Sequence, residues 1–368
     1  MASEMLYPVV PIYLKEIGFS IFLIGLLEGI AEFTAGLSKG YFGKKSDEQG
    51  LRLPFVRMGY FLSAISKPMM AVLKWPLWLF SARAIDRLGK GVRTAARDAL
   101  LSQNATTQTK ARVFALHRGM DTLGAVSGPI IALIFLYYFP KDYISLFYIA
   151  FIPGLVAVLL TFLLKEKQQP TSTMKKGNFF SFLAYWRIAP SEYKKLVTGL
   201  LIFTLFNSSD VFLLLKTREI TGDDTLTIAA YIFYNLVYAI CAYPIGVIAD
   251  RYGLKTVFSC GLLLFATVYF LFAFTQTTTG VFIAFFIYGL YAAATEGISK
   301  AWITNISHNA NTGTAIGFYT SGQSIATLLA SSSTGLLWTI AGSGLPFMLT
   351  GLTSLGIFIY FRAIKLKS

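Results

Sequence analysis

Long apolar runs, separated by short polar intervals, make up most of this chain of 368 residues. A helix that crosses the hydrocarbon of a bilayer needs about 20 mostly apolar residues. Eleven runs of that kind lie between Phe22 and Phe361, and a shorter apolar run, Met5 to Leu14, precedes them. The pattern predicts an all-α membrane protein with twelve spanning helices. Because the short run carries no signal-peptide pattern, we interpret it as the end of an N-terminally truncated first helix.

The longest polar interval, residues 165–195, divides the apolar runs into six and six. We therefore predict an N-terminal six-helix bundle at residues 1–164, a cytoplasmic linker at 165–195 and a C-terminal six-helix bundle at 196–368. Short cytoplasmic loops retain Lys and Arg. The loops on the linker's side carry a net charge of +13, and the opposite loops sum to zero. We expect the chain to lie in the cell inner membrane, with both termini in the cytoplasm.

The amino-acid composition supports the prediction of a membrane protein. Only 14% of the residues are charged and 55% are apolar, whereas a soluble domain averages about 25% charged residues. The net charge of +14 would suggest nucleic acid as the partner of a soluble protein, but here the loops explain it. The two cysteines lie in apolar runs without zinc-binding spacing. We expect the protein to bind no nucleic acid, cofactor or metal. We expect it to be a monomer in the lipid bilayer.

One loop pattern occurs twice, at a shift of 203 residues. Glycine permits a tight turn and close backbone approach, and Asp can cap a helix start while it accepts from Arg. The first copy departs from the second at Lys45 and Glu48. The shared positions are Gly43, Asp47, Gly50 and Arg52 in the first copy, and Gly246, Asp250, Gly253 and Lys255 in the second. The second copy also has Arg251, where the first copy has Glu48.

The repeated loop resembles the signature loop of the major facilitator superfamily, and the resemblance covers the whole chain. It implies a twelve-helix major facilitator fold, with two six-helix bundles around a cavity that opens alternately to either side. It also implies that the repeated loops latch one conformation. Gly124, Gly128 and Pro129 resemble a motif of the superfamily's drug–proton antiporters and predict a helix bend. Ala132 and Leu133 replace the motif's two final glycines.

Charged residues recur along the span from Pro76 to Arg97 on one face of a helix, within a stripe of about 120°. A charge at mid-bilayer costs about 2.5 to 3.5 kcal/mol, so these side chains must face protein or water. We predict that they line a substrate cavity, with a structural charge network as the alternative. The stripe comprises Arg83, Asp86, Arg87, Lys90, Arg93 and Arg97.

Further polar residues lie within other predicted spans. Tyr231, Asn235 and Glu296 are candidates for the cavity in the C-terminal half. A buried carboxylate near movable cations can exchange a proton close to neutral pH, although a fixed ion pair is the alternative for each such residue. The proton-coupling candidates are Glu28, Glu32, Asp86, His117 and Asp121.

The segment from Leu88 to Gly91 lacks the residues of a phosphate-binding loop, so an ion gradient rather than ATP is the expected energy source. We predict a secondary active transporter that moves a small organic, anionic or zwitterionic solute as a proton-coupled exporter, an antiporter. An anion or metabolite importer of the same fold is the alternative. A membrane-embedded lipid-headgroup transferase is a third class, built on Asp86 and Asp98. The partners would be a small-molecule substrate and protons or another coupling ion.

Overall fold

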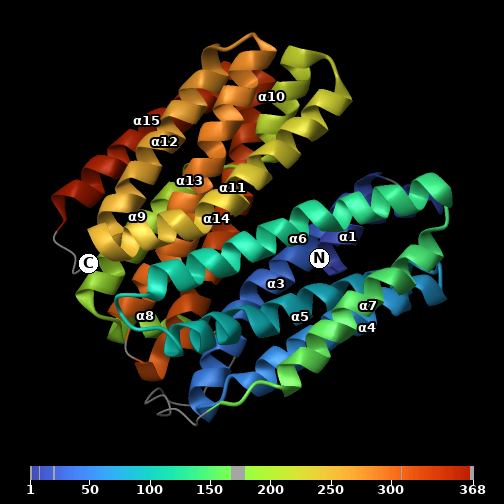
Figure 1. Cartoon of the computed structure of the whole chain (residues 1–368), viewed down its shortest axis with the longest axis horizontal. Coiled ribbons are helices and arrows are strands. Elements are labelled where there is room, and N and C mark those ends of the chain that lie inside the picture. The colour runs from blue at the N-terminus through green and yellow to red at the C-terminus, as the bar shows by residue number, and fades with distance from the viewer. Residues whose placement is uncertain (1, 8, 20, 167–178, 308, 365–368) are drawn as a thin grey trace. The chain divides into compact units, whose positions relative to one another are not determined.

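The computed structural model describes residues 2–7, 9–19, 21–166, 179–307 and 309–364 (Figure 1). Within these ranges the side chains of residues 11–12, 15–16, 21–33, 179, 211, 224–225, 228, 309 and 339 lie outside the description. Regular structure in these ranges is helical throughout. The N-terminal helices are α1 (Ala2–Leu6), α2 (Val9–Glu16), α3 (Ile21–Gln49), α4 (Leu53–Val72), α5 (Pro76–Gln103), α6 (Lys110–Tyr138) and α7 (Tyr143–Phe162).

The linker region contributes two short helical segments before the C-terminal helices begin. These are η1 (Phe179–Ala184) and α8 (Tyr185–Ile188). The C-terminal elements are α9 (Ser191–Phe206), α10 (Val211–Thr221), α11 (Asp224–Tyr252), α12 (Leu254–Phe274), α13 (Thr278–Ile306), η2 (Asn309–Asn311), α14 (Thr312–Ala341) and α15 (Gly344–Ala363).

The chain forms two compact units, which are described separately. Unit 1 comprises residues 1–103, 124–188 and 308–321, and unit 2 comprises residues 104–123, 189–307 and 322–368. In unit 1, α4 runs beside α5 and α7; in unit 2, α12 runs beside α13 and α15 (Figure 1). Helices α6 and α14 each contribute to both units. The predicted division into six and six helices stays a prediction.

Several helices differ from the apolar runs that predict them. Helix α3 continues to Gln49 and α11 to Tyr252, so the repeated loops begin inside helices and only short turns follow them. Gly50 and Gly253 provide those turns, with φ of 65° and 93°, a region that favours glycine. The run from Leu196 to Leu215, predicted as one span, is divided between α9 and α10.

Unit 1 is held together by close backbone contact between α4 and α5. A Cβ atom added at Gly89 would lie 2.6 Å from the Gly59 carbonyl oxygen, and one at Gly59 would lie 2.5 Å from Arg93 Cβ. Glycine at both positions therefore brings the charged helix α5 against α4. Elsewhere in unit 1, Tyr13 of α2 packs edge-on against Phe147 of α7, with ring centroids 5.1 Å apart.

Unit 2 has an aromatic core. Phe265 of α12 lies with its ring centroid 4.9 Å from Phe203 of α9 and 4.5 Å from Tyr291 of α13, which are favourable separations for aromatic pairs. By length and composition, six helices in the described residues could cross a membrane. They are α6, α7, α12, α13, α15 and α11 from Ala229 onward.

Candidate transport and latch sites

The charged face of α5 begins with a buried ion network. Lys67 Nζ of α4 lies 2.5 Å from Asp86 Oδ1, and Arg83 Nη1 lies 3.6 Å from Asp86 Oδ2. Ser3 of α1 accepts a hydrogen bond from Lys67 Nζ at 2.9 Å. Arg87 is also buried. Lys67 was missing from the predicted set, although a lysine inside an apolar run signals a buried partner.

The later stripe residues are half-buried and face neighbouring groups of unit 1. Arg93 Nη1 donates to Ser63 Oγ at 2.6 Å, and its guanidinium lies 4.7 Å from the Tyr60 ring centroid. Arg97 Nη2 lies 3.2 Å from Asp98 Oδ1. Lys90 is half-buried on the same helix. The stripe thus combines packed ion pairs with partly accessible cations, and its role in substrate binding stays a prediction.

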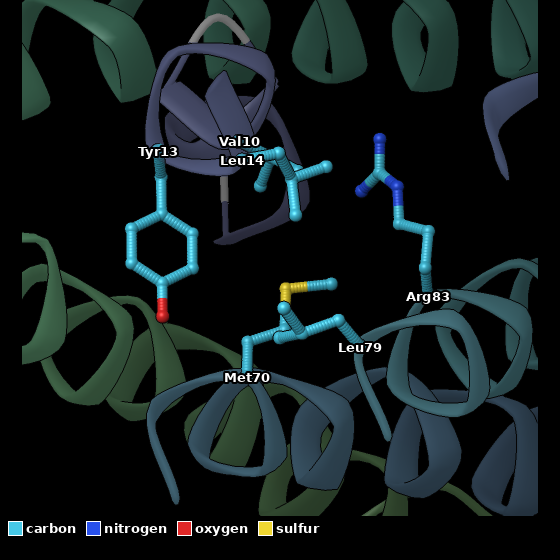
Figure 2. A pocket seen from close by; sticks show the side chains of 6 residues that line it. All are labelled: Val10, Tyr13, Leu14, Met70, Leu79 and Arg83. Atoms are coloured by element: carbon cyan, nitrogen blue, oxygen red, sulfur yellow. The ribbon is translucent and has the colours of Figure 1, made fainter. Parts of the chain in front are cut away.

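A small pocket in unit 1 adjoins the start of the stripe (Figure 2). Arg83 rises from α5 along one side of the pocket, and the remaining lining is almost entirely apolar. The lining residues are Val10, Tyr13, Leu14, Met70, Leu79 and Arg83. Asp86, which is also buried, pairs with Arg83 beside this lining.

An ion pair in unit 2 links two long helices, about two turns after the start of α6 and about three turns before the end of α13. Arg118 Nη2 of α6 contacts Glu296 Oε2 of α13, and the Tyr238 hydroxyl of α11 donates to the same oxygen at 3.3 Å. The side chains of Arg118 and Glu296 are 32% and 39% exposed. The sequence predicted Glu296 but not Arg118 as a cavity residue. Charges at this depth that keep partial exposure are expected to line water.

One turn of α6 brings two predicted coupling residues together. His117 Nδ1 lies 3.9 Å from Asp121 Oδ2, beside Arg118 on the same helix. Asn235, which is buried, donates to the Tyr231 carbonyl oxygen of its own helix at 2.9 Å. The side chains of Glu28 and Glu32 lie outside the described residues. Gly124, Gly128 and Pro129 lie within the continuous helix α6.

The first repeated loop contacts the start of α14 in unit 1. Asp47 Oδ1 accepts from the Gly313 N–H at 3.1 Å, and Asp47 Oδ2 accepts from the Thr314 N–H at 2.5 Å. Arg52 pairs with the same carboxylate. A Cβ atom at Gly43 would lie 2.3 Å from the Gly313 oxygen. A carboxylate at a helix start satisfies free N–H groups and the helix dipole.

The second repeated loop makes the matching contact in unit 2, with the start of α6. Asp250 Oδ1 accepts from the Ala111 N–H at 2.9 Å, and Asp250 Oδ2 accepts from the Arg112 N–H at 3.1 Å. A Cβ atom at Gly246 would lie 2.6 Å from Ala115 Cβ. Each copy therefore combines a glycine that permits close approach with an aspartate that caps a different helix.

The basic residues of the two copies have different contacts. Arg52 pairs with Asp47, whereas Lys255 Nζ donates to the Ile364 carbonyl oxygen at 2.8 Å, at the end of α15. The Arg251 guanidinium lies 5.5 Å from the Tyr252 ring centroid. Glu166, at the start of the linker, accepts from the Arg52 N–H at 2.8 Å and caps α4. The resemblance alone did not distinguish these contacts.

Burial raises the pKa of Asp47 to about 6, and burial also raises the pKa of Asp250. If Asp47 returns to an ordinary pKa of about 3.9 when its contact opens, the closed contact binds protons more tightly. The ratio of closed to open contacts should therefore rise about tenfold from pH 7 to pH 5. Double electron–electron resonance measures the distances between spin labels at Gln49 and Ala310. The populations of the short and the long distance give this ratio.

The control for that measurement is Asp47→Asn, in the same double-labelled background with Cys241 and Cys260 replaced. This variant keeps the shape of the side chain but cannot titrate, so its distance distribution should change less with pH than that of the wild type. The change that remains is the contribution of Asp250. A wild-type ratio that is constant, or that falls as the pH falls, contradicts the expectation.

Comparison with known proteins decides the family. The sequence profile of the Major Facilitator Superfamily matches residues 1–233 and 196–367. The chain belongs to the major facilitator superfamily. An uncharacterized MFS-type transporter of Methanocaldococcus jannaschii is 30% identical over 347 residues, which are 93% of this chain and 86% of that protein. The chain is therefore a multi-pass membrane protein and a secondary transporter.

Two further similarities concern the fold and one part of the sequence. The crystal structure of the human organic anion transporter MFSD10 matches with a TM-score of 0.79 and 16% identity, over 98% of this chain and 95% of that chain. The predicted major facilitator fold is thereby confirmed. A multi-drug resistance efflux pump homolog of Lactococcus lactis is 27% identical over 135 residues, 36% of this chain and 33% of that protein.

Proposed function

We propose that this transporter is a proton-coupled exporter of small organic anions or zwitterions. It would work by alternating access between two six-helix halves, residues 1–164 and 196–368, with both termini in the cytoplasm. The observation that carries the proposal is the partly exposed pair of Arg118 and Glu296, placed well inside α6 and α13. Two opposite charges that remain accessible at this depth form a site for a solute that carries charge itself.

The pair favours an anionic or zwitterionic solute because of how its charges can be exchanged. A carboxylate of the solute can bind Arg118 bidentately, and an ammonium group can bind the released Glu296. The solute then replaces one ion pair with two, which offsets the loss of the first. Tyr238, which already donates to Glu296, supplies a neutral hydrogen bond beside the charges.

Export is supported by the similarity of about a third of the chain to a relative named as an efflux pump. Proton coupling is supported by His117 and Asp121, which lie next to Arg118 on α6. A histidine paired with a carboxylate changes its charge near neutral pH. The Asp47 and Asp250 contacts join helices of the two proposed halves and would hold one conformation closed at the cytoplasmic side.

Liposomes with an imposed pH difference test this proposal. Thermal-shift screening of monocarboxylates, amino acids and cationic dyes first identifies a solute that binds. A proton antiporter should then accumulate that solute in vesicles with an acidic interior, whereas a symporter accumulates it in vesicles with an alkaline interior. Accumulation only with an alkaline interior favours the importer, and uptake indifferent to pH removes proton coupling. Protein-free liposomes provide the baseline.

A further inference from the structure

The connection between α9 and α10 interrupts a predicted membrane span. Four polar residues, 207–210, separate Phe206 from Val211. Asn207 Nδ2 donates to the Tyr291 hydroxyl at 3.1 Å, and the Ser209 N–H donates to Ser331 Oγ at 3.1 Å. Irregular backbone at membrane depth occurs where protein or a water-filled cavity surrounds it, and transporters place ion sites at such broken helices.

Asp210, the last residue of this connection, ties the break to two other helices of unit 2. Its Oδ2 accepts from the Tyr234 hydroxyl of α11 at 2.7 Å, and its Oδ1 accepts from the Tyr288 hydroxyl of α13 at 2.5 Å. Both tyrosines are buried. Although Asp210 occupies the N-cap position of α10, its side chain makes no capping hydrogen bond. The carboxylate therefore accepts hydrogen bonds from the two tyrosines and does not cap its own helix.

Asp210 lies in the connection before α10, and it differs from the carboxylates described inside long helices because its contacts within the described part of the chain include no cation. Asp86 has Lys67, and Glu296 has Arg118. In the part of the chain that the structure describes, the titratable groups that interact electrostatically with Asp210 include four tyrosines and one glutamate, which are neutral or acidic. They are Tyr234 on α11, Tyr269 on α12, and Tyr288, Tyr291 and Glu296 on α13.

Asp210 is half-buried, and a carboxylate that is partly removed from water with no cation beside it is stabilised by a positive charge from elsewhere. The geometry of its contacts suits a proton better than a metal ion. Both tyrosine hydroxyls donate to the carboxylate, so their hydrogens point at the oxygens that a metal would need. A hard cation takes several oxygen ligands. A proton needs one remaining lone pair, and a protonated carboxyl group becomes a donor to which a hydroxyl can turn as acceptor.

We propose that Asp210 binds the transported proton in the C-terminal half. This rests on the proposed proton coupling and adds a residue outside the predicted candidates. Proton binding converts two charge-assisted hydrogen bonds into neutral ones, which are roughly half as strong. The link from the helix break to α11 and α13 then weakens, and α10 can shift. Loss of the proton to the opposite side restores the charged acceptor and the link.

Infrared spectroscopy of the purified full chain tests the site without a known substrate. Difference spectra between pH 5 and pH 9 should show the carbonyl band of a protonated carboxyl group, and Asp210→Asn should lose one such band. Tyr288→Phe should retain the band to higher pH, because the charged form loses a donor. A full set of bands in Asp210→Asn overturns the proposal.

Further arms separate the possible outcomes. Both variants must elute as single peaks and unfold at wild-type temperature, and Tyr234→Phe replaces a variant that fails this check. Spectra recorded in sodium chloride and in choline chloride should coincide. If sodium removes the band at constant pH, Asp210 binds a metal cation instead of a proton. If pH-driven uptake fails while the band persists, the proposed transport fails and the site stands. If pH-driven uptake survives in Asp210→Asn, the site fails and the transport stands.

Discussion

Asp86→Asn is expected to destabilise the protein by about 3 to 5 kcal/mol, the range found when one partner of a buried ion pair is removed. Asp86 is 3% exposed, and both Lys67 and Arg83 pair with its carboxylate. The amide would leave these cations buried without their counter-charge. Unfolding of the detergent-solubilised protein, followed by tryptophan fluorescence, measures the loss.

The double variant Asp86→Asn/Lys67→Met separates a structural network from a coupling site. Removing Lys67 together with the carboxylate should recover much of the lost stability, because the nearest uncompensated cation is gone. If Asp86 is instead a coupling residue, as its place in the sequence suggests, Asp86→Asn should fold normally and lose proton movement. A stable single variant therefore contradicts the network.

Arg118→Gln is expected to abolish transport, with at least about a hundredfold loss of uptake rate, while it changes stability by about 1 kcal/mol or less. The stability effect is small because both partners of the Arg118–Glu296 pair are about one-third exposed. The effect on transport is large because the guanidinium is the proposed anchor of the solute's anionic group. Uptake into liposomes with an acidic interior and thermal unfolding together measure the two quantities.

Two controls sharpen this second expectation. On α10, Lys216 Nζ lies 3.0 Å from Glu219 Oε1. Glu219→Gln breaks this ion pair and should leave uptake unchanged. The swapped variant Arg118→Glu/Glu296→Arg retains attraction between the helices but reverses the polarity of the site. Uptake should stay lost in the swap if these groups bind solute. Recovery of uptake would show that only the attraction between α6 and α13 matters.

The chain's own pattern was sufficient for the major facilitator fold and for the internal repeat, although one predicted span is divided between α9 and α10. Asp47 and Asp250 were identified as equivalent, and the structure gives them equivalent contacts with helix starts. The helices they cap could not be predicted, since spacing along the chain does not tell which distant helix start lies beside a loop. For the same reason the sequence identified Glu296 but not its partner Arg118.

Two features left a signal that the sequence analysis did not use. Lys67 stands within an apolar run, and a lone lysine there calls for a buried acid such as Asp86. The four consecutive polar residues 207–210 interrupt another run and mark the break before α10. The coupling roles of Glu28, Glu32, His117 and Asp121 depend on proton movement and stay predictions.

Helices α6 and α14 are each divided between the two compact units, at residues 123/124 and 321/322. The opening residues of α6 belong with the C-terminal helices, and those of α14 belong with the N-terminal ones. If the halves are divided at the linker as proposed, the first residues of one helix from each half pack with the helices of the other half. A half expressed alone would lack the segment from the other half and leave an aspartate, Asp47 or Asp250, without the amide groups that it caps.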